Sequence, residues 1–285
     1  MIIDCKKIRE EIKQELKKRD LSNIKGIFIQ VGDNQASNVY VRNKCKLCEE
    51  LGIEYEHMKL DDSVSEEELL NIIDMLNKTK CVTGIMVQLP LPKHISEEKV
   101  IDAIDPNKDI DGFTNVNKGK LMIGDETGII PCTPKGIITV LEHENIDIEG
   151  KNVVIVGRSN IVGKPLAQLL INKGATVTVC NSKTDRDVLK QQIILSDIFI
   201  SAIGQPNYFN KSFFMKNDDN FYPEFLEDII AIDVGINRDE NNKLCGDISK
   251  DIYDYFDGIT PVPGGIGLLT VLEVVRNLIK CGENN

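Results

Sequence analysis

A tyrosine and a lysine stand four residues apart in the segment SNVYVRNKC, residues 37–45. On a helix, Tyr40 and Lys44 would share one face, because residues at i and i+4 are neighbours on its surface. Burial lowers the pKa of a lysine, which can then exchange protons near neutral pH, and an adjacent phenol can orient or relay the proton. The pair indicates proton-transfer chemistry, and a solvated helix face is the alternative interpretation.

Further polar residues follow apolar segments. Gln88 stands near the end of the run VTGIMVQLP, residues 82–90. The carboxyl ends of parallel strands are where α/β proteins bind ligands, so Gln88 is either a substrate contact or a core amide with its own partner. Asp109 and Asp111 stand on either side of Ile110 in DIDGF. Either carboxylate can bind the exocyclic amino group of a heterocycle, or the segment can be an Asx turn.

The segment PVPGGIG, residues 261–267, combines two prolines with three glycines ahead of an apolar run. Glycines let a flat ligand approach the backbone closely, and prolines fix φ. Pro263, Gly264 and Gly265 are therefore candidates for binding a ligand, and a stiff interdomain turn is the alternative.

The segment VVIVGRSNIVGKP reads as a strand, a tight glycine turn and a helix, the layout that places a pyrophosphate on helix N-terminal amides. Its spacing is not G-x-G-x-x-G, because Ser159 stands where the second glycine of that fingerprint would be. Gly157, Arg158 and Gly163 complete the turn. An ordinary βαβ unit without a ligand is the alternative interpretation.

The segment after the next strand favours NADP over NAD. NAD-binding folds place a carboxylate about 20 residues beyond the glycines, where it binds the ribose 2′-hydroxyl. Here the chain has no carboxylate until Asp185, and it offers Ser182 and Lys183 instead. Together with Arg158 these residues suit a 2′-phosphate, although Arg158 can also be a solvated loop cation.

The elements that must position these residues alternate between helix and strand in both halves of the chain. Ser37 is predicted to cap the helix that Gly52 ends, and Ser65 to cap the helix over residues 65–78. The pattern predicts an α/β protein with mostly parallel sheets. Strands are predicted at 26–32, 53–60, 82–90, 151–157, 175–180, 196–204 and 229–236, and helices at the N-terminus through about residue 18, at 162–174 and after the final glycines. Residues 105–119 read as turns, and NDDN, residues 217–220, as a polar loop.

Composition excludes several classes of protein. The net charge of −11 makes nucleic acid a poor partner, and no apolar run of about 18 residues predicts a membrane span. The eight cysteines occur without a secretion signal, so we expect reduced thiols and a cytoplasmic protein. Cys45 and Cys48 form a CxxC without a second pair, which favours buried thiols over zinc or redox chemistry, and the three histidines have no metal-ligand spacing.

Nine motifs together resemble one family, the bifunctional methylenetetrahydrofolate dehydrogenase/methenyltetrahydrofolate cyclohydrolases. They span nearly the whole chain in the family's order: ASNVYVRNK, GIMVQLPLP, DIDGF with NKGKL, PCTPKGI, VVIVGRSNIVGKP, NSKT, AIDVGIN, GDI and TPVPGGIG. The resemblance implies oxidation of 5,10-methylenetetrahydrofolate by NADP+ and hydrolysis of the methenyl product to 10-formyltetrahydrofolate in one-carbon metabolism.

The resemblance also implies an architecture of two α/β domains that flank a cleft, usually in a homodimer. The expected folate-binding domain contains residues 1–118 and 265–285, to which the C-terminal helix returns. The expected Rossmann-like NADP-binding domain contains residues 119–264.

By motif match, Lys44 handles the proton of the cyclohydrolase step, Gln88 supports Lys44, and Tyr40 stacks on the folate. Asp111 binds the pterin end of the folate, and Gly264 and Gly265, next to Pro263, line the same pocket. The residues matched to the NADP site are Thr133, Gly157, Arg158, Ser159, Val162, Gly163, Ser182 and Ile236, and no metal site is implied.

Two features depart from the family pattern. Leu268 stands where proline is common, and the connection over residues 209–228 is longer than usual.

Two rival interpretations also exist. Tyr40 and Lys44 can be read as the YxxxK pair of a short-chain dehydrogenase, but that pair follows the nucleotide loop and here it precedes Gly157. The other rival is a nucleotide-binding regulatory module without turnover.

Overall fold

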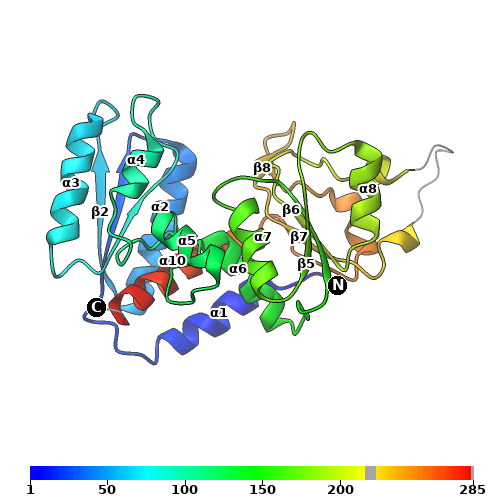
Figure 1. Cartoon of the computed structure of the whole chain (residues 1–285), viewed down its shortest axis with the longest axis horizontal. Coiled ribbons are helices and arrows are strands. Elements are labelled where there is room, and N and C mark those ends of the chain that lie inside the picture. The colour runs from blue at the N-terminus through cyan, green and yellow to red at the C-terminus, as the bar shows by residue number, and fades with distance from the viewer. Residues whose placement is uncertain (216–222, 284–285) are drawn as a thin grey trace. The chain divides into compact units, whose positions relative to one another are not determined.

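The computed structural model describes residues 1–215 and 223–283. The chain forms two compact units, which we name after their main sheets (Figure 1). The five-strand unit contains Met1–Glu10 and Thr133–Leu269, and the three-strand unit contains Glu11–Cys132 and Thr270–Asn285. The predicted polar loop at 217–220 lies outside the described residues.

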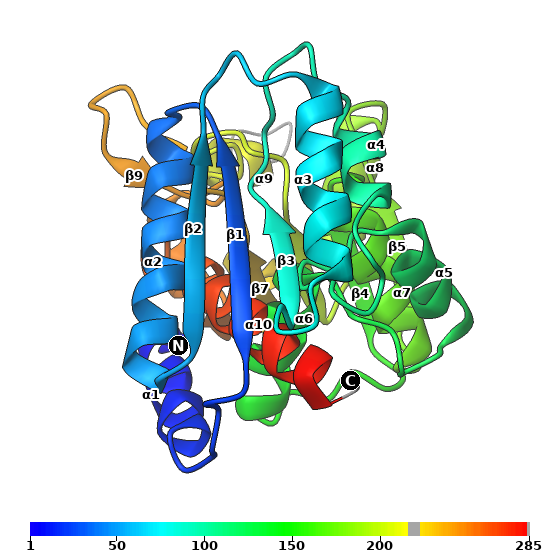
Figure 2. The same cartoon turned by 90° about the vertical axis from the view of Figure 1, so that its left-hand side faces the viewer.

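The three-strand unit is built on a parallel sheet of order β2-β1-β3, whose strands run in the same direction in Figure 2. Its strands are β1 (Lys25–Val31), β2 (Glu54–Leu60) and β3 (Gly84–Val87). Its helices are α2 (Gln35–Leu51), α3 (Glu66–Lys78), α4 (Glu97–Asp102) and α5 (Asn115–Ile123). The boundary between the units falls within α1 (Cys5–Leu16), α6 (Cys132–His143) and α10 (Ile266–Glu283).

A hydrophobic core joins α3 to this sheet. Ile27 and Ile29 of β1 pack in one cluster with Leu69 and Ile73 of α3. Ser65 caps α3 as predicted, because its side chain accepts a hydrogen bond from the amide of Glu68. Central strand β1 is thereby packed against α3.

Two local predictions for this unit are wrong. Asn34, not Ser37, caps α2, because the Asn34 side chain accepts hydrogen bonds from the amides of Ala36 and Ser37. The predicted end of this helix at Gly52 is confirmed, with a left-handed φ of 68°. The segment 105–119 is also not all turn: Thr114 caps α5, which continues to Ile123.

The five-strand unit contains a parallel sheet of order β10-β7-β6-β4-β5. Its strands are β4 (Asn152–Val156), β5 (Thr176–Cys180), β6 (Ile198–Ser201), β7 (Ile230–Asp233) and β10 (Gly258–Ile259). A small hairpin is formed by β8 (Asn237–Arg238) and β9 (Leu244–Cys245). The helices are α7 (Gly163–Asn172), α8 (Arg186–Ile194) and α9 (Lys211–Phe214), and the 3-10 segments are Pro223–Phe225 and Lys250–Tyr255.

The strand order reverses at β4 in this sheet. The chain passes from β4 to β5 at the edge and then returns to β6 on the other side of β4. In doubly wound sheets the ligand crevice lies at such a reversal, outside the carboxyl ends of the strands. The predicted α/β class with parallel sheets is confirmed.

Candidate active site

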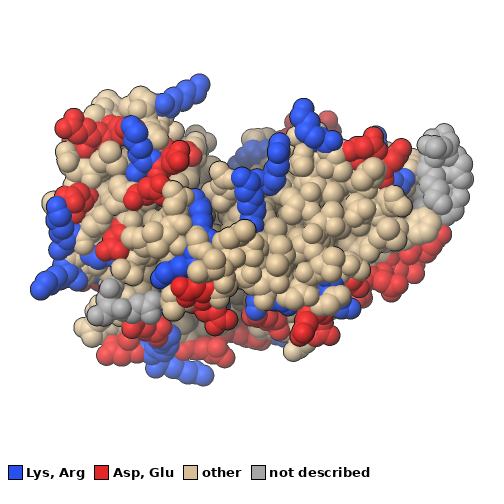
Figure 3. Space-filling view, in the orientation of Figure 1, with Lys and Arg blue, Asp and Glu red and all other residues tan. Residues whose placement is uncertain are grey.

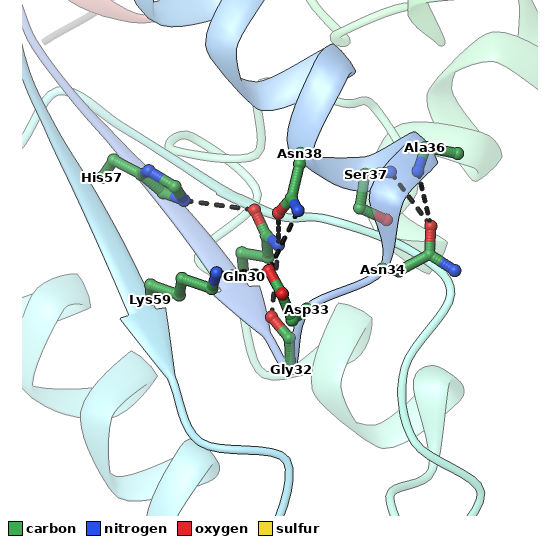
Figure 4. A network of polar contacts seen from close by, with 9 residues as sticks. All are labelled: Gln30, Gly32, Asp33, Asn34, Ala36, Ser37, Asn38, His57 and Lys59. Carbon is green, nitrogen blue, oxygen red and sulfur yellow. Dashed lines mark hydrogen bonds and ion pairs between the residues drawn. The ribbon is translucent and has the colours of Figure 1, made fainter.

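A polar network fixes the start of α2, the helix that carries Tyr40 and Lys44 (Figure 4). The side chain of Gln30, on β1, donates hydrogen bonds to the carbonyl of Gly32 at 3.2 Å and to Oδ1 of Asn38 at 2.6 Å. Asn38 in turn donates to Asp33 at 2.9 Å. Because Gln30 is buried in the sheet, the first turn of α2 is tied to the end of β1.

Lys44 lies buried in the three-strand unit, with 5% of its surface exposed. Its Nζ atom lies 3.0 Å from Oε1 of Gln88 and 2.9 Å from the sulfur of Met86. Burial lowers the pKa of Lys44, and the negative charge of Asp111 opposes this effect. The structure therefore provides the desolvated amine that the sequence predicts, and it adds a contact with Met86 of β3.

Gln88 is positioned by the sheet. Its backbone amide donates to the carbonyl of Ile29 at 2.8 Å, which places Gln88 directly after β3. Its side-chain Nε2 donates to the carbonyl of Leu89 at 2.7 Å, and this bond leaves Oε1 directed at Lys44. Gln88 is thus a polar contact of the buried lysine, and its amide has partners within the protein. A contact between Gln88 and a substrate stays a prediction.

Tyr40 lies one turn before Lys44 on α2 and is half-buried. Burial raises the pKa of its phenol, so the hydroxyl stays protonated and can donate a hydrogen bond at neutral pH. The side chain offers a ring face and a hydrogen-bond donor one helical turn from Lys44.

The two carboxylates of DIDGF have different environments. Asp109 is buried and accepts hydrogen bonds from the amides of Gly112 at 2.9 Å and Thr114 at 2.8 Å, and from Nδ2 of Asn117 at 3.0 Å. Asp109 therefore forms an Asx turn, one of the two roles that the sequence predicts for this segment. Asp111 makes no hydrogen bond or ion pair with another described residue, and burial raises its pKa to about 6, against the lowering effect of Lys44.

The backbone beside Asp111 is held by a buried asparagine of α10, which motif reasoning missed. Nδ2 of Asn277 donates to the carbonyls of Ile110 at 3.0 Å and Ile130 at 2.9 Å. A long-range contact of this kind leaves no local signal in the sequence. Lys44 of α2 and two partly buried loop residues, Gln88 and Asp111, are thus linked, Gln88 by contact with the amine and Asp111 by charge.

In the five-strand unit, the turn after β4 is as tight as the sequence predicts. Gly157 has φ 133°, and a Cβ there would lie 2.4 Å from the carbonyl oxygen of Ala202. A Cβ on Gly163 would lie 2.2 Å from the carbonyl oxygen of Gly157. Ser159 accepts a hydrogen bond from the amide of Val162 at 3.1 Å, which shapes the entry to α7. The glycine turn therefore fits a dinucleotide, which requires close backbone approach at this position.

The residues expected near a 2′-phosphate also fit. Arg158, Ser182 and Lys183 are exposed. Asp185, the first carboxylate after β5, caps α8 by accepting hydrogen bonds from the amides of Asp187 and Val188. A carboxylate used in this way is not placed to bind a ribose hydroxyl, which favours NADP over NAD.

The remaining candidates all lie in the five-strand unit. Thr133 is the second residue of α6, and Ile236 is exposed after β7. Pro263 follows a cis peptide bond, and Gly264 has φ 99°. A Cβ on Gly265 would lie 2.3 Å from the carbonyl oxygen of Pro261, so a side chain would not fit there. Pro263, Gly264 and Gly265 are thus in a different unit from Lys44, and their contact with a folate stays a prediction.

The described residues contain no cluster of metal-ligating side chains, and none of their helices is long and apolar enough to cross a membrane. The eight cysteines are present as thiols, and Cys45 and Cys48 are buried, as the sequence indicates.

Two family models together cover almost the entire chain. The tetrahydrofolate dehydrogenase/cyclohydrolase catalytic domain matches residues 3–111, and the NAD(P)-binding domain of the same family matches residues 131–285. The chain belongs to the tetrahydrofolate dehydrogenase/cyclohydrolase family.

Relatives and solved structures agree with this family. The bifunctional protein FolD of Agathobacter rectalis is 46% identical over 96% of this chain and 94% of its own. The bifunctional FolD of Campylobacter jejuni has a TM-score of 0.92 at 39% identity and covers 100% of this chain and 99% of its own. The Trypanosoma brucei FolD, solved with NADP and an inhibitor, has a TM-score of 0.88 at 31% identity and covers 100% and 97%.

The family predicted from the sequence is thus confirmed, and so is the two-domain fold with a Rossmann-like nucleotide-binding domain. Membership of this family gives no support to the interpretation of Tyr40 and Lys44 as a short-chain dehydrogenase pair.

Proposed function

We propose that this chain oxidises 5,10-methylenetetrahydrofolate with NADP+ and hydrolyses the methenyl product to 10-formyltetrahydrofolate, as a bifunctional enzyme of one-carbon metabolism. The single observation that carries this proposal is the buried amine of Lys44, which contacts Gln88 and whose pKa is affected by the negative charge of Asp111. It occurs in a chain whose family is named for both activities. In the proposed domain roles, residues 1–118 and 265–285 bind folate and residues 119–264 bind NADP.

In the dehydrogenase step, the task of the protein is positioning. NADP+ supplies the hydride acceptor when it is bound. Tyr40 stacks on the folate, and Asp111 binds the amino group of the pterin end. Pro263, Gly264 and Gly265 line the folate pocket, Thr133 lies beside the nicotinamide, and Ile236 contacts the cofactor. These contacts hold the bridging carbon in place for hydride loss.

In the cyclohydrolase step, Lys44 handles the proton. Water adds to the methenyl carbon and gives one proton to a base, which leaves a neutral hydroxyl adduct. The bond between N5 and this carbon then breaks as the hydroxyl becomes the formyl carbonyl, and its proton ends on N5. An ordinary lysine is an ammonium ion at neutral pH, but burial lowers the pKa of Lys44, and a cationic substrate lowers it further. The neutral amine accepts the proton from water, and Gln88 Oε1 fixes its direction.

Arg158, Ser182 and Lys183 support NADP as the preferred cofactor. All three are exposed at the end of the sheet that carries the glycine turn, and the nearby carboxylate of Asp185 is used as a helix cap. A 2′-phosphate would meet a cation here, whereas the 2′-hydroxyl of NAD would find no carboxylate acceptor among these residues. Gly157, Ser159, Val162 and Gly163 form the turn that holds the pyrophosphate.

We further propose a cytoplasmic homodimer. Eight cysteines present as thiols suit a reducing compartment. Strand β5 is an edge strand whose Val179 is 39% exposed, and a second copy can pair with this edge about a two-fold axis. Nucleic acid is not an expected partner, because the net charge is −11 and basic side chains lie scattered among acidic and uncharged ones on the face in Figure 3.

A spectrophotometric assay tests the proposed function. The purified chain is mixed with methylenetetrahydrofolate and either NADP+ or NAD+, and the absorbance of the reduced nucleotide is followed. We expect NADPH to form faster than NADH. A second assay follows the loss of methenyltetrahydrofolate without nucleotide. A chain that binds NADP+ but shows no turnover in either assay would be the regulatory module instead.

A further inference from the structure

A buried carboxylate connects the turns that follow β6 and β7. Asp247 is 0% exposed, and its two oxygens accept five hydrogen bonds. The donors to Oδ2 are Ser201 Oγ at 2.9 Å and the amides of Ile203 at 2.8 Å and Gly204 at 3.3 Å. The donors to Oδ1 are the amide of Gln205 and Nδ2 of Asn237, both at 2.9 Å.

A second carboxylate holds Asp247 in place. Oδ1 of Asp233 accepts from the amides of Gly235 at 2.9 Å and Asp247 at 3.0 Å, and Oδ2 accepts from the amide of Ile248 at 2.9 Å. A Cβ on Gly235 would lie 2.2 Å from Asp247 Oδ1, and a Cβ on Gly246 would lie 1.8 Å from Asp233 Oδ2. Only glycine fits at both positions, so the two carboxylates are built closely into the backbone.

The turn held by Asp247 borders the place where the strand order reverses. Strand β6 is the neighbour of β4 in the sheet, and the amide of Ala202 donates to the carbonyl of Val156 at 2.8 Å. The glycine turn packs directly on this residue, since a Cβ on Gly157 would touch the Ala202 carbonyl. Residues 202–205 therefore form one side of the crevice in which a doubly wound sheet binds its ligand.

We propose that Asp247 is a positioning residue for the dinucleotide. It fixes the backbone of residues 203–205, and through Asn237 it fixes the segment that presents Ile236. Being fully buried, its side chain touches no cofactor and acts only through these two turns. The proposal rests on the proposed function, because it assumes that NADP binds at this end of the sheet.

The test uses the Asp247→Asn variant of the full chain. Asparagine keeps the size of the side chain, but its NH2 group is a donor and would face donors that now bond to the carboxylate. We expect faster hydrogen exchange in peptides that cover residues 202–206. We also expect the Kd for NADP+, measured by calorimetry, to rise about tenfold or more. Cyclohydrolase turnover without nucleotide should stay within about twofold, since Lys44 and Gln88 belong to the other unit. Asp254→Asn, an exposed aspartate on the same unit, is the matched control.

A merely structural role would lower cyclohydrolase turnover and thermal stability together with NADP+ binding, and that result would overturn the proposal. Accelerated exchange with an unchanged Kd would overturn it as well. If Asp247→Asn does not fold, Ser201→Ala removes one donor from a fully buried site, and its Kd for NADP+ must then rise with cyclohydrolase turnover retained. A wild-type chain that binds no NADP+ would contradict the proposed function itself. The hydrogen exchange of residues 202–206 is measured without nucleotide, so it still reports whether Asp247 holds this turn.

Discussion

The Nζ atom of Lys44 lies 3.0 Å from Oε1 of Gln88, whose own Nε2 is committed to the carbonyl of Leu89. The amide therefore faces the amine with an acceptor, which favours the ammonium form, while burial favours the neutral amine. The balance of these two effects sets the pH at which Lys44 can accept a proton.

Two substitutions of Gln88 should move this balance in opposite directions. Gln88→Glu places a carboxylate beside the amine, raises the pKa of Lys44 and shifts the acid limb of the cyclohydrolase pH–rate profile upward by about one pH unit or more. Gln88→Met removes the acceptor and shifts the same limb downward. The measurement is the initial rate of methenyltetrahydrofolate loss across pH. Shifts of the same sign in both variants would argue against Lys44 as the titrating group.

The character of this site could be predicted from the sequence, but its contacts could not. Spacing on a helix placed Tyr40 and Lys44 on one face. The choice between Asp109 and Asp111 needed the structure, because both stand in one turn motif and only the hydrogen bonds show that Asp109 forms the turn. Asn277 is over 140 residues from Cys132 in sequence, so its contacts leave no local pattern.

The fold was predictable wherever periodicity was strong, and less so at element ends. Residues 65–78 carry both an amphipathic pattern and a serine cap, and α3 forms there. Asn34 outcompetes Ser37 as the cap of α2 because its side chain reaches two amides. Residues 115–119 are rich in asparagine and glycine, yet Thr114 caps a helix over them. The part of the long 209–228 connection that is described forms α9 and one 3-10 turn.

Asp111 should make the stability of the protein depend on pH. Its pKa is about 6 in the folded protein, because burial penalises the charged form, against an ordinary value of 3.8. The stabilising effect of the protonated carboxyl is complete below pH 3.8 and is lost as the pH rises through about 6. Asp111→Asn avoids this loss.

The free energy of unfolding of Asp111→Asn and wild type should therefore be compared by urea denaturation at about pH 4 to about pH 8. We expect the difference in favour of the variant to grow with pH. Asp62→Asn, an exposed site in the same unit, controls for the loss of one charge. A difference that shrinks with rising pH would contradict the assignment of a raised pKa to Asp111.

Arg158 should determine the choice of cofactor. Arg158→Ser removes the exposed cation beside the glycine turn, so the KM for NADP+ should rise by about tenfold while the KM for NAD+ changes little. Lys151→Ser, at the opposite end of β4, is the control for net charge. An equal loss for both nucleotides would assign Arg158 to the pyrophosphate or to the fold.

The β5 edge should carry the dimer contact. Light scattering during size-exclusion chromatography should give twice the chain mass of 31.9 kDa for wild type. Val179→Lys introduces a charge on the pairing edge and should give the monomer mass. Val116→Lys, at a similarly exposed valine on α5, should leave the dimer intact. A dimer that persists in Val179→Lys would place the interface elsewhere.

The role of Lys44 as the proton acceptor is tested by the rate at which Lys44→Met hydrolyses methenyltetrahydrofolate. Methionine fills the buried site without a charge, so the variant should fold, and thermal unfolding checks this. Lys46→Met, an exposed lysine on the same helix, is the control. We predict that hydrolysis by Lys44→Met falls by about 10²- to 10⁴-fold while Lys46→Met keeps the wild-type rate. A folded Lys44→Met variant that hydrolyses the substrate at the wild-type rate would show that Lys44 is not the proton acceptor.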